Sequence, residues 1–303
     1  DPTALDGLRT GETVDLVMYD FGAISVVYSI GVSGPLAKLL DLSDELYDNQ
    51  KLLADSRRRV EEILRVIGDA AVEPRIADFV EDYVIFQIES LNPPLTADEL
   101  CARYPQRLTQ ILRAERDPLS SQEAEDALAA RLSFRSADLA VVDWNAALLV
   151  DREGDDIRAV LEFANVELLE MRYLDQKLDR ALDQAYVALS KRSWRGLPFF
   201  RTYGADLRRV AELQAEGALL FEGVNNTLKL LGDQYLARVY RQASRRFHLE
   251  EWDASILRKL DTLKSIYAMI SDQLTDRRME LLEWVIVILI AAEIALELVH
   301  RMP

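Results

Sequence analysis

The stretch DDIRAVLEFANVELLEMRYLDQKLDRALDQAYVALS, residues 155–190, marks a change in the character of the chain. Its apolar residues recur at alternating intervals of four and three, and Asp175 is the single interruption of this seam. The seam consists of Ile157, Leu161, Ala164, Leu168, Met171, Leu178, Leu182, Ala185 and Leu189. A heptad seam of this kind is typical of a long helix that packs against partner helices with a left-handed crossing.

Two more apolar stripes follow in the second half of the chain. The first is formed by Val210, Leu213, Leu220, Val224, Leu228, Leu231, Tyr235 and Val239. The second is formed by Trp252, Ile256, Leu260, Leu263, Tyr267, Ile270 and Leu274. Between residues 119 and 302 the only proline is Pro198, so little interrupts the helices. We therefore expect an antiparallel three-helix coiled bundle over residues 152–280, with the stripes as its core.

The first half of the chain has a different pattern, because seven of the twelve glycines lie at or before Gly154. Apolar and β-branched runs predict strands, and helical spacing predicts the segments between them. We expect a hairpin of 14–19 and 23–30, helical structure to about 67, a strand at 82–88, helices within 96–114 and 120–132, and a hairpin of 139–142 and 146–150. The fold class is α+β, with a small mixed domain over residues 1–151.

The C-terminal stretch LLEWVIVILI (281–290) followed by AAEIALELV (291–299) is strongly apolar. Nineteen helical residues extend about 28 Å, close to the thickness of a bilayer core. The sequence therefore predicts a C-terminal transmembrane helix over 281–300. The alternative is a helix buried in an oligomer.

The residues around this stretch predict how it would be used. Arg277, Arg278 and Trp284 fit the membrane flank, with the bulk of the chain facing the cytoplasm. Glu293 and Glu297 are one helical turn apart, and acids inside a membrane turn away from lipid, so they predict an intramembrane oligomer contact. The expected location is the cytoplasmic membrane of a bacterium, or the mitochondrial inner membrane in a eukaryote.

The segment 191–203, KRSWRGLPFFRTY, contains four basic residues, four aromatic residues and no acids. This composition fits the headgroup layer of a membrane, so we predict a membrane-surface loop. Its candidate residues are Lys191, Arg192, Trp194, Arg195, Phe199, Phe200 and Arg201. A solvated hairpin tip and a surface for single-stranded nucleic acid are the alternatives.

Charge and composition exclude several classes of protein. With 52 acids and 36 bases the formal net charge is −16, which excludes a protein that coats nucleic acid over a broad basic surface. One cysteine, Cys101, excludes an internal disulfide framework, and two histidines exclude the usual Cys/His zinc sites. No phosphate-binding glycine motif is present, and the shortage of cysteine and histidine leaves very little with which to build an active site. We therefore expect no catalytic residue, no metal and no cofactor.

Two segments resemble a known family. They are 161–175, LEFANVELLEMRYLD, and 278–294, RMELLEWVIVILIAAEI. They are similar to segments of the "required for meiotic nuclear division" family (RMD/RMND), whose domain has no known function, and the similarity covers about residues 139–299. The resemblance implies a membrane-tethered protein without catalytic activity, and it transfers no site residues.

Together these observations predict a non-enzymatic, membrane-anchored scaffold. It would form homo-oligomers, contact membrane lipid, and present its N-terminal domain to a protein partner of unknown identity. Nucleic acid is expected as a partner only through the basic loop. The alternative is an oligomer that conducts or senses ions through the face formed by Glu293 and Glu297.

Overall fold

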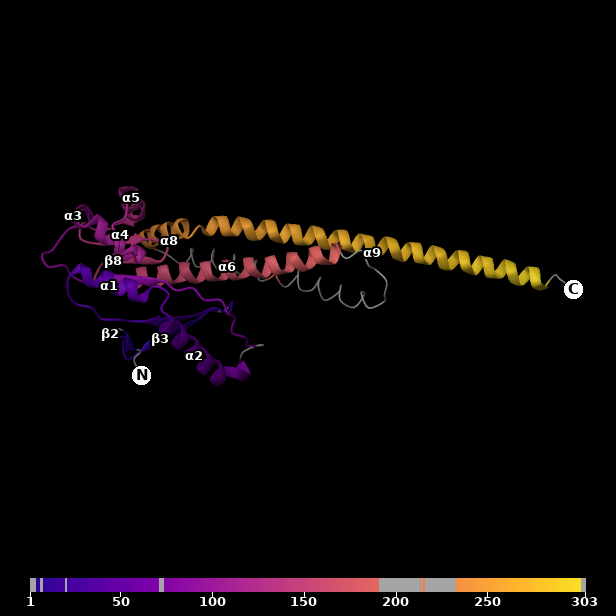
Figure 1. Ribbon diagram of the computed structural model, residues 1–303, viewed down its shortest axis with the longest axis horizontal. Helices are drawn as coiled ribbons and strands as arrows, with labels where there is room; N and C mark the ends of the chain where they lie inside the picture. The colour runs from indigo at the N-terminus through magenta and orange to yellow at the C-terminus, as the bar shows by residue number, and fades with distance from the viewer. Residues whose placement is uncertain are drawn as a thin grey trace. The chain divides into compact units, whose positions relative to one another are not determined.

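The computed structural model describes residues 4–5, 8–19, 21–70, 74–190, 213, 215 and 233–300. Within these ranges, the side chains of 4, 5, 8, 69, 188–190, 270–278, 280–282 and 292–300 are not described. The chain divides into two compact units. Figure 1 labels the helices and strands that are described below. Unit 1 comprises residues 1–173 and 218–253, and unit 2 comprises 174–217 and 254–303.

Unit 1 begins with short antiparallel pairs of strands. β1 (Ala4–Leu5) pairs with β2 (Leu8–Arg9), and β3 (Val14–Met18) pairs with β4 (Ile24–Tyr28). The second pair confirms the predicted hairpin, in which Gly22 has a φ of +108° that favours glycine. Two helices follow, α1 (Leu36–Leu46) and α2 (Gln50–Ile67), and then the 3₁₀ turn η1 (Gly68–Ala70).

The centre of unit 1 is a four-stranded sheet in the order β5-β8-β7-β6. Its strands are β5 (Val84–Ile88), β6 (Arg131–Leu132), β7 (Leu139–Val142) and β8 (Ala146–Val150). β7 and β8 form the predicted antiparallel hairpin, and every residue in both is buried. β5 pairs with β8 in parallel, because the long connection between them contains helices that carry the chain back across the sheet.

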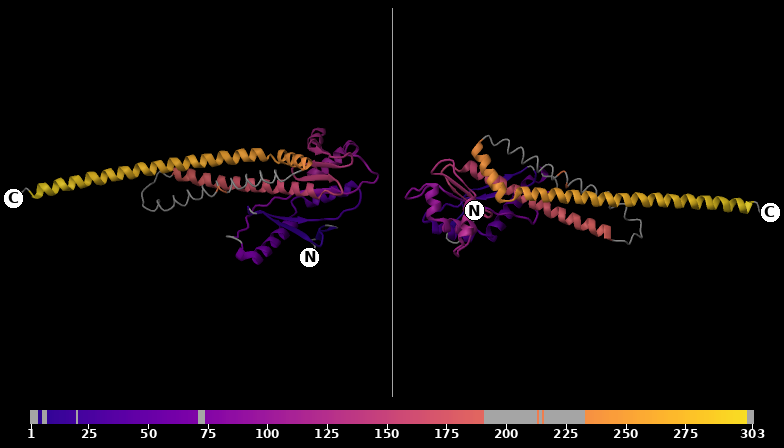
Figure 2. Two further views of the ribbon diagram at one scale, coloured as in Figure 1. Left: turned by 180° about the vertical axis from the view of Figure 1, so that it is seen from behind. Right: turned by 90° about the horizontal axis from the view of Figure 1, so that it is seen from above.

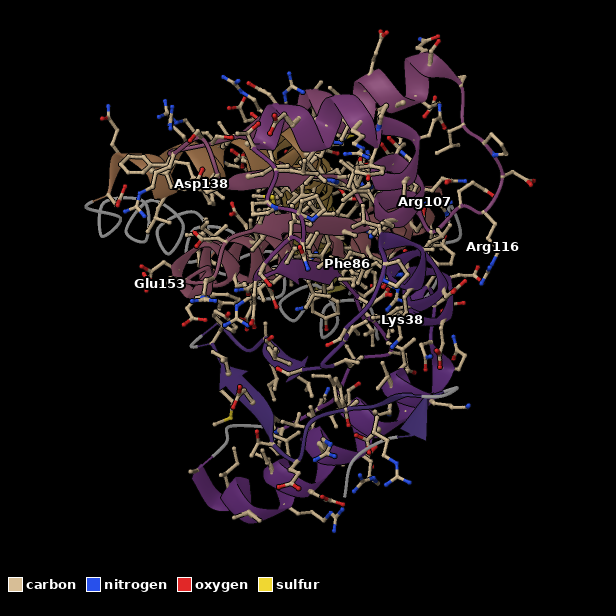
Figure 3. The ribbon with its side chains drawn as sticks, turned by 90° about the vertical axis from the view of Figure 1, so that its left-hand side faces the viewer. Lys38, Phe86, Arg107, Arg116, Asp138 and Glu153 are labelled. Atoms are coloured by element: carbon tan, nitrogen blue, oxygen red, sulfur yellow. The ribbon has the colours of Figure 1, made fainter. Side chains whose placement is uncertain are left out.

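Three helices of that connection cover the sheet. They are α3 (Ala97–Arg103), α4 (Pro105–Arg113) and α5 (Ser121–Ala129). α4 packs on β8 and α5 on β7. α3 begins at a capping box, in which Thr96 and Glu99 satisfy each other's backbone N–H groups. Figure 3 shows Phe86 of β5 inside unit 1, whereas Arg116 and Glu153 lie at its periphery.

The second half of the chain is helical where it is described. α6 (Asp155–Ser190) carries the predicted seam, with Leu161, Ala164 and Leu178 completely buried. α8 (Gln234–Arg246) and α9 (Leu249–His300) follow. Most of the predicted middle helix, including the stripe from Val210 to Leu231 apart from Leu213, lies outside the described residues.

Within unit 2, α6 and α9 lie side by side and run in the same direction (Figures 1 and 2). Ile256 and Leu263 of α9 are completely buried, as the third stripe predicts. Lys259 Nζ lies 2.8 Å from Asp175 Oδ2 and 2.6 Å from Asp179 Oδ1. Asp175, the interruption of the heptad seam, is therefore the ion-pair partner of a neighbouring helix.

The predicted transmembrane helix is wrong. Residues 281–300 are helical as part of α9, but among the described residues no helix is long and apolar enough to span a membrane. Three acidic residues explain why this part of α9 is not apolar enough to span a membrane. Glu283 and Glu293 enclose only the nine uncharged residues 284–292, and Glu297 follows one turn later. A span needs about twenty apolar residues, and an acid at its centre is costly.

The same finding contradicts the predicted membrane-anchored location. Both the bacterial cytoplasmic membrane and the mitochondrial inner membrane were inferred from that span. The same finding contradicts the predicted membrane and transmembrane character of the chain, whereas its α+β character is confirmed.

Candidate functional site

The predicted site residues are distributed between described and undescribed parts of the chain. The loop residues from Lys191 to Arg201 lie outside the described residues. Arg277, Arg278, Glu293 and Glu297 lie in α9, in parts whose side chains are not described. Their roles at a membrane depended on the contradicted span. Trp284 is described, and its side chain is exposed.

The most unusual surface is an apolar segment of α9, residues 284–291, which we call the apolar segment. Its large side chains are 51% to 64% exposed although they point to all sides of the helix. They are Trp284, Val285, Ile286, Val287, Ile288, Leu289 and Ile290. A helix that is apolar all round is normally buried, and an apolar patch of this size marks an interaction site.

A polar cluster in unit 1 surrounds the buried Asp143 in the β7–β8 turn. Asp143 is 1% exposed, and its carboxylate accepts hydrogen bonds from Arg113 Nε at 3.0 Å and Arg246 Nε at 2.8 Å. Both guanidinium groups also contact Asp126, which is half exposed, and Arg113 pairs with Glu123 as well. The bonds to Arg246 and Arg113 hold the pKa of Asp126 below its usual range. The cluster joins α4, α5, the sheet and the end of α8.

His248 lies at the joint between α8 and α9. Its φ is +54°, and its carbonyl accepts hydrogen bonds from the N–H groups of Glu251 and Trp252, at 3.1 Å each. Its ring stacks on Trp144 with centroids 5.3 Å apart. The histidine therefore starts α9 and packs against the β7–β8 turn.

Another polar cluster in unit 1, around Glu167, lies between α6, α8 and the start of α9. Glu167 is 3% exposed and accepts a hydrogen bond of 2.6 Å from the Tyr240 hydroxyl. Burial raises the pKa of Glu167 to about 7; the bond from Tyr240 opposes this, and the charge of Asp253 adds to it. Asp253 Oδ1 is itself buried without a hydrogen-bond partner among the described residues. Buried acids with raised pKa values are candidates for proton-linked behaviour.

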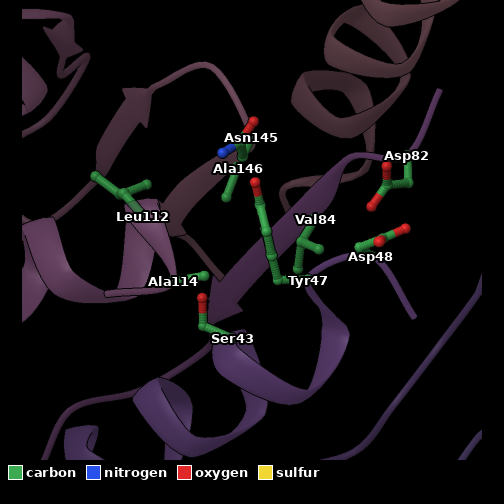
Figure 4. A pocket seen from close by; sticks show the side chains of 9 residues that line it. All are labelled: Ser43, Tyr47, Asp48, Asp82, Val84, Leu112, Ala114, Asn145 and Ala146. Atoms are coloured by element: carbon green, nitrogen blue, oxygen red, sulfur yellow. The ribbon is translucent and has the colours of Figure 1, made fainter. Parts of the chain in front are cut away.

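Unit 1 also contains a pocket of about 260 Å³ beside the β7–β8 turn (Figure 4). Its apolar floor is formed by Val84, Leu112 and Ala146, and Tyr47 lies across it. Asp48 and Asp82 lie close together at one side. Burial raises the pKa of Asp82, and the charge of Asp48 adds to the effect. The pocket therefore has an acidic rim.

Comparison with known proteins identifies the first half of the chain. The family model described as "Uncharacterized protein MJ0711, N-terminal domain" matches residues 3–156, half of the chain. The chain belongs to this family.

The MJ0711 N-terminal domain family is one of unknown function. "Uncharacterized protein MJ0711" of Methanocaldococcus jannaschii is 26% identical to the chain over 226 residues. The alignment covers 73% of this chain and 66% of the relative, so the chain spans just under two thirds of that protein's length. No solved structure matches the chain.

The match places the family in the part of the chain where sequence reasoning found no specific resemblance. The MJ0711 N-terminal domain contains the four-stranded sheet, the pocket and Asp143. Sequence reasoning missed Asp143 and Glu167 as well. Asp143 carried one signal, a charged residue between two fully apolar strands, whereas Glu167 in a helix looks like any solvated acid.

Proposed function

We propose that the chain is a non-enzymatic scaffold that assembles through the apolar segment of α9 with a second copy of itself. Each copy presents its MJ0711 N-terminal domain to a protein partner. The exposure of seven consecutive large apolar side chains carries the proposal. A catalytic role finds less support, because the polar clusters of unit 1 join elements of the fold.

The amount of apolar surface supports a second copy as the occupant. Full burial of one such side chain stabilises by roughly 1.5–3 kcal/mol, and these side chains are about half exposed. Because these side chains point to all sides of α9, two copies bury only those on the contacting side, which stabilises by roughly 5 kcal/mol before the cost of association. A second copy therefore removes from water a large part of the apolar surface that the chain leaves exposed.

The order of residues in α9 supports self-association. With 3.6 residues per turn, Glu283, Glu293 and Glu297 share one side of the helix. Trp284, Ile288 and Ala291 follow heptad spacing on the opposite side. Two copies can therefore pack along that seam without bringing their carboxylates together. In this arrangement Glu293 and Glu297 lie outside the contact.

The resemblance to the "required for meiotic nuclear division" family belongs to this proposal only. It rests on segments 161–175 and 278–294, which lie beyond the matched domain. The alternative, an oligomer that conducts or senses ions through the face formed by Glu293 and Glu297, was inferred from the contradicted membrane span, so we do not propose it.

Ile288→Glu is expected to weaken self-association about thirty-fold, because two copies each lose roughly 1 kcal/mol of apolar burial. Analytical ultracentrifugation over a range of concentrations measures the dissociation constant.

Leu257→Glu is the matched control. Leu257 is a half-exposed aliphatic residue on the same helix, outside the apolar segment, so assembly should not change. A wild-type chain that stays monomeric at all concentrations, or equal weakening by both substitutions, contradicts the proposal.

A further inference from the structure

α8 carries an arginine ladder, which we define as Arg238, Arg241 and Arg245. All three are exposed, and their spacing of three and four residues puts them on one side of the helix. Val239, Tyr240 and Ala243 are buried on the other side. α8 packs on β7, so its position in unit 1 is determined by the sheet.

The arginines of this ladder differ from the neighbouring Arg246 in their ion pairing. None of the three arginines forms an ion pair there, whereas Arg246 turns inward and pairs with Asp126 and Asp143. Arg238 lies over the Tyr235 ring at 5.5 Å, and Arg241 Nε donates to the carbonyl of Ala237. Three exposed guanidinium groups without an ion pair among the described residues form a local cationic surface on a chain of net charge −16.

Exposed aromatic rings lie at both ends of the ladder. At the beginning of α8, Phe134 is 66% exposed and contacts Tyr235 with ring centroids 5.5 Å apart. At the end, Trp144 is 44% exposed and stacks on His248, two residues after the helix. The rings are held by neighbours and still present free surface, so they are preorganised for stacking.

We propose that this surface of α8 binds single-stranded nucleic acid. The arginines would contact successive phosphates, and unpaired bases would stack on Trp144 and Phe134. An acidic peptide would also satisfy the arginines, but it would leave the exposed rings unused. A duplex hides the faces of its bases, so a single strand fits better.

The size and charge of the site limit the expected affinity. The thirteen residues of α8 extend about 20 Å, which accommodates only a few nucleotides. Carboxylates flank the ladder, with Asp233 at the start of α8 and Glu251 beside His248. Binding is therefore expected to be weak, dependent on salt and restricted to this surface, in agreement with the exclusion of a broad nucleic-acid coat.

Fluorescence anisotropy with a labelled twelve-nucleotide oligouridine tests the proposal on the full chain. Replacing all three ladder arginines by serine should lower the affinity at least tenfold at low salt. It should also reduce the slope of log affinity against log salt by about 2, since three phosphate contacts are lost. Trp144→Ala should lower the affinity about tenfold and leave the salt slope unchanged.

The control replaces three exposed arginines elsewhere, Arg65, Arg103 and Arg152, by serine. It changes the net charge equally and should retain wild-type affinity, and circular dichroism verifies that each variant is folded. No binding by the wild-type chain, or equal losses in the two triple variants, overturns the proposal. An oligoglutamate peptide that binds the ladder more tightly than the RNA also overturns it and indicates an acidic protein partner.

Discussion

Asp143→Ala is expected to lower the free energy of unfolding by about 3 to 5 kcal/mol. The carboxylate is buried between Arg113 and Arg246, and it also accepts a hydrogen bond of 2.9 Å from the N–H of Trp144. Without this carboxylate, two largely buried guanidinium groups lose an ion-pair partner, and the β7–β8 turn loses the hydrogen bond from the N–H of Trp144. Unfolding by urea, followed by circular dichroism, measures the change.

Asp126→Ala provides the comparison, because Asp126 contacts the same two arginines from an exposed position. Its loss should cost less than about 1 kcal/mol, since water replaces an exposed partner. The double variant should be less destabilised than the sum of the two single changes if the groups act as one network. Equal effects of the two single substitutions would show that burial of Asp143 does not matter.

Glu167→Gln is expected to stabilise the chain by about 3 kcal/mol at pH 8 and by very little near pH 4.5. Burial raises the pKa of Glu167 from 4.5 in the unfolded chain to about 7 in the folded one. The folded state therefore binds more protons between these values, and stability falls as the pH rises through them. Each unit of difference between the folded and the unfolded pKa changes the free energy of unfolding by about 1.4 kcal/mol. Glutamine resembles the protonated acid and still accepts the bond from Tyr240.

The free energy of unfolding of both proteins should be measured at several pH values between 4.5 and 8.5. The difference between variant and wild type should grow with pH and level off above about pH 7. Asp183→Asn is the control, because Asp183 is an exposed acid on the same helix, and its difference should remain flat. A flat difference for Glu167→Gln would show that this glutamate is not held protonated by the fold.

The polar clusters around Asp143 and Glu167 hold the helix that carries the proposed nucleic-acid surface. Arg246 and Tyr240 are both on α8, and they tie this helix to Asp143 and to Glu167. The arginine ladder is on the opposite side of the same helix. Loss of either buried contact should therefore loosen the element that carries the ladder, so binding by the two variants should be compared only under conditions where they are folded.

Local patterns predicted much of the fold. Residues 14–28 form the expected hairpin, and residues 139–150 form another, because alternating or continuous apolar runs bounded by turns leave few other structures. From Ile157 to Ala185 the heptad seam of α6 is buried as its spacing predicts, except that Leu182 is half-buried. The parallel pairing of β5 with β8 was not predictable, since it depends on where the intervening helices return the chain.

The C-terminal segment shows what the sequence determines and what only the tertiary structure determines. Its sequence determined that residues 281–299 are helical and strongly apolar, because local propensity and side-chain hydrophobicity are properties of the residues themselves. The sequence did not determine whether these apolar side chains pack against other parts of the chain. Only the tertiary structure shows that the large side chains from Trp284 to Ile290 remain exposed within the chain.

The same distinction applies to charge. The sequence alone determined an acidic chain with long helices and little cysteine or histidine. Only the tertiary structure decided that Asp143 and Glu167 are buried while Arg238, Arg241 and Arg245 are exposed and form no ion pair with any described residue. The physical reason is that burial and pairing depend on residues far apart in the chain, such as Asp143 and Arg246, and no local pattern specifies which of them meet.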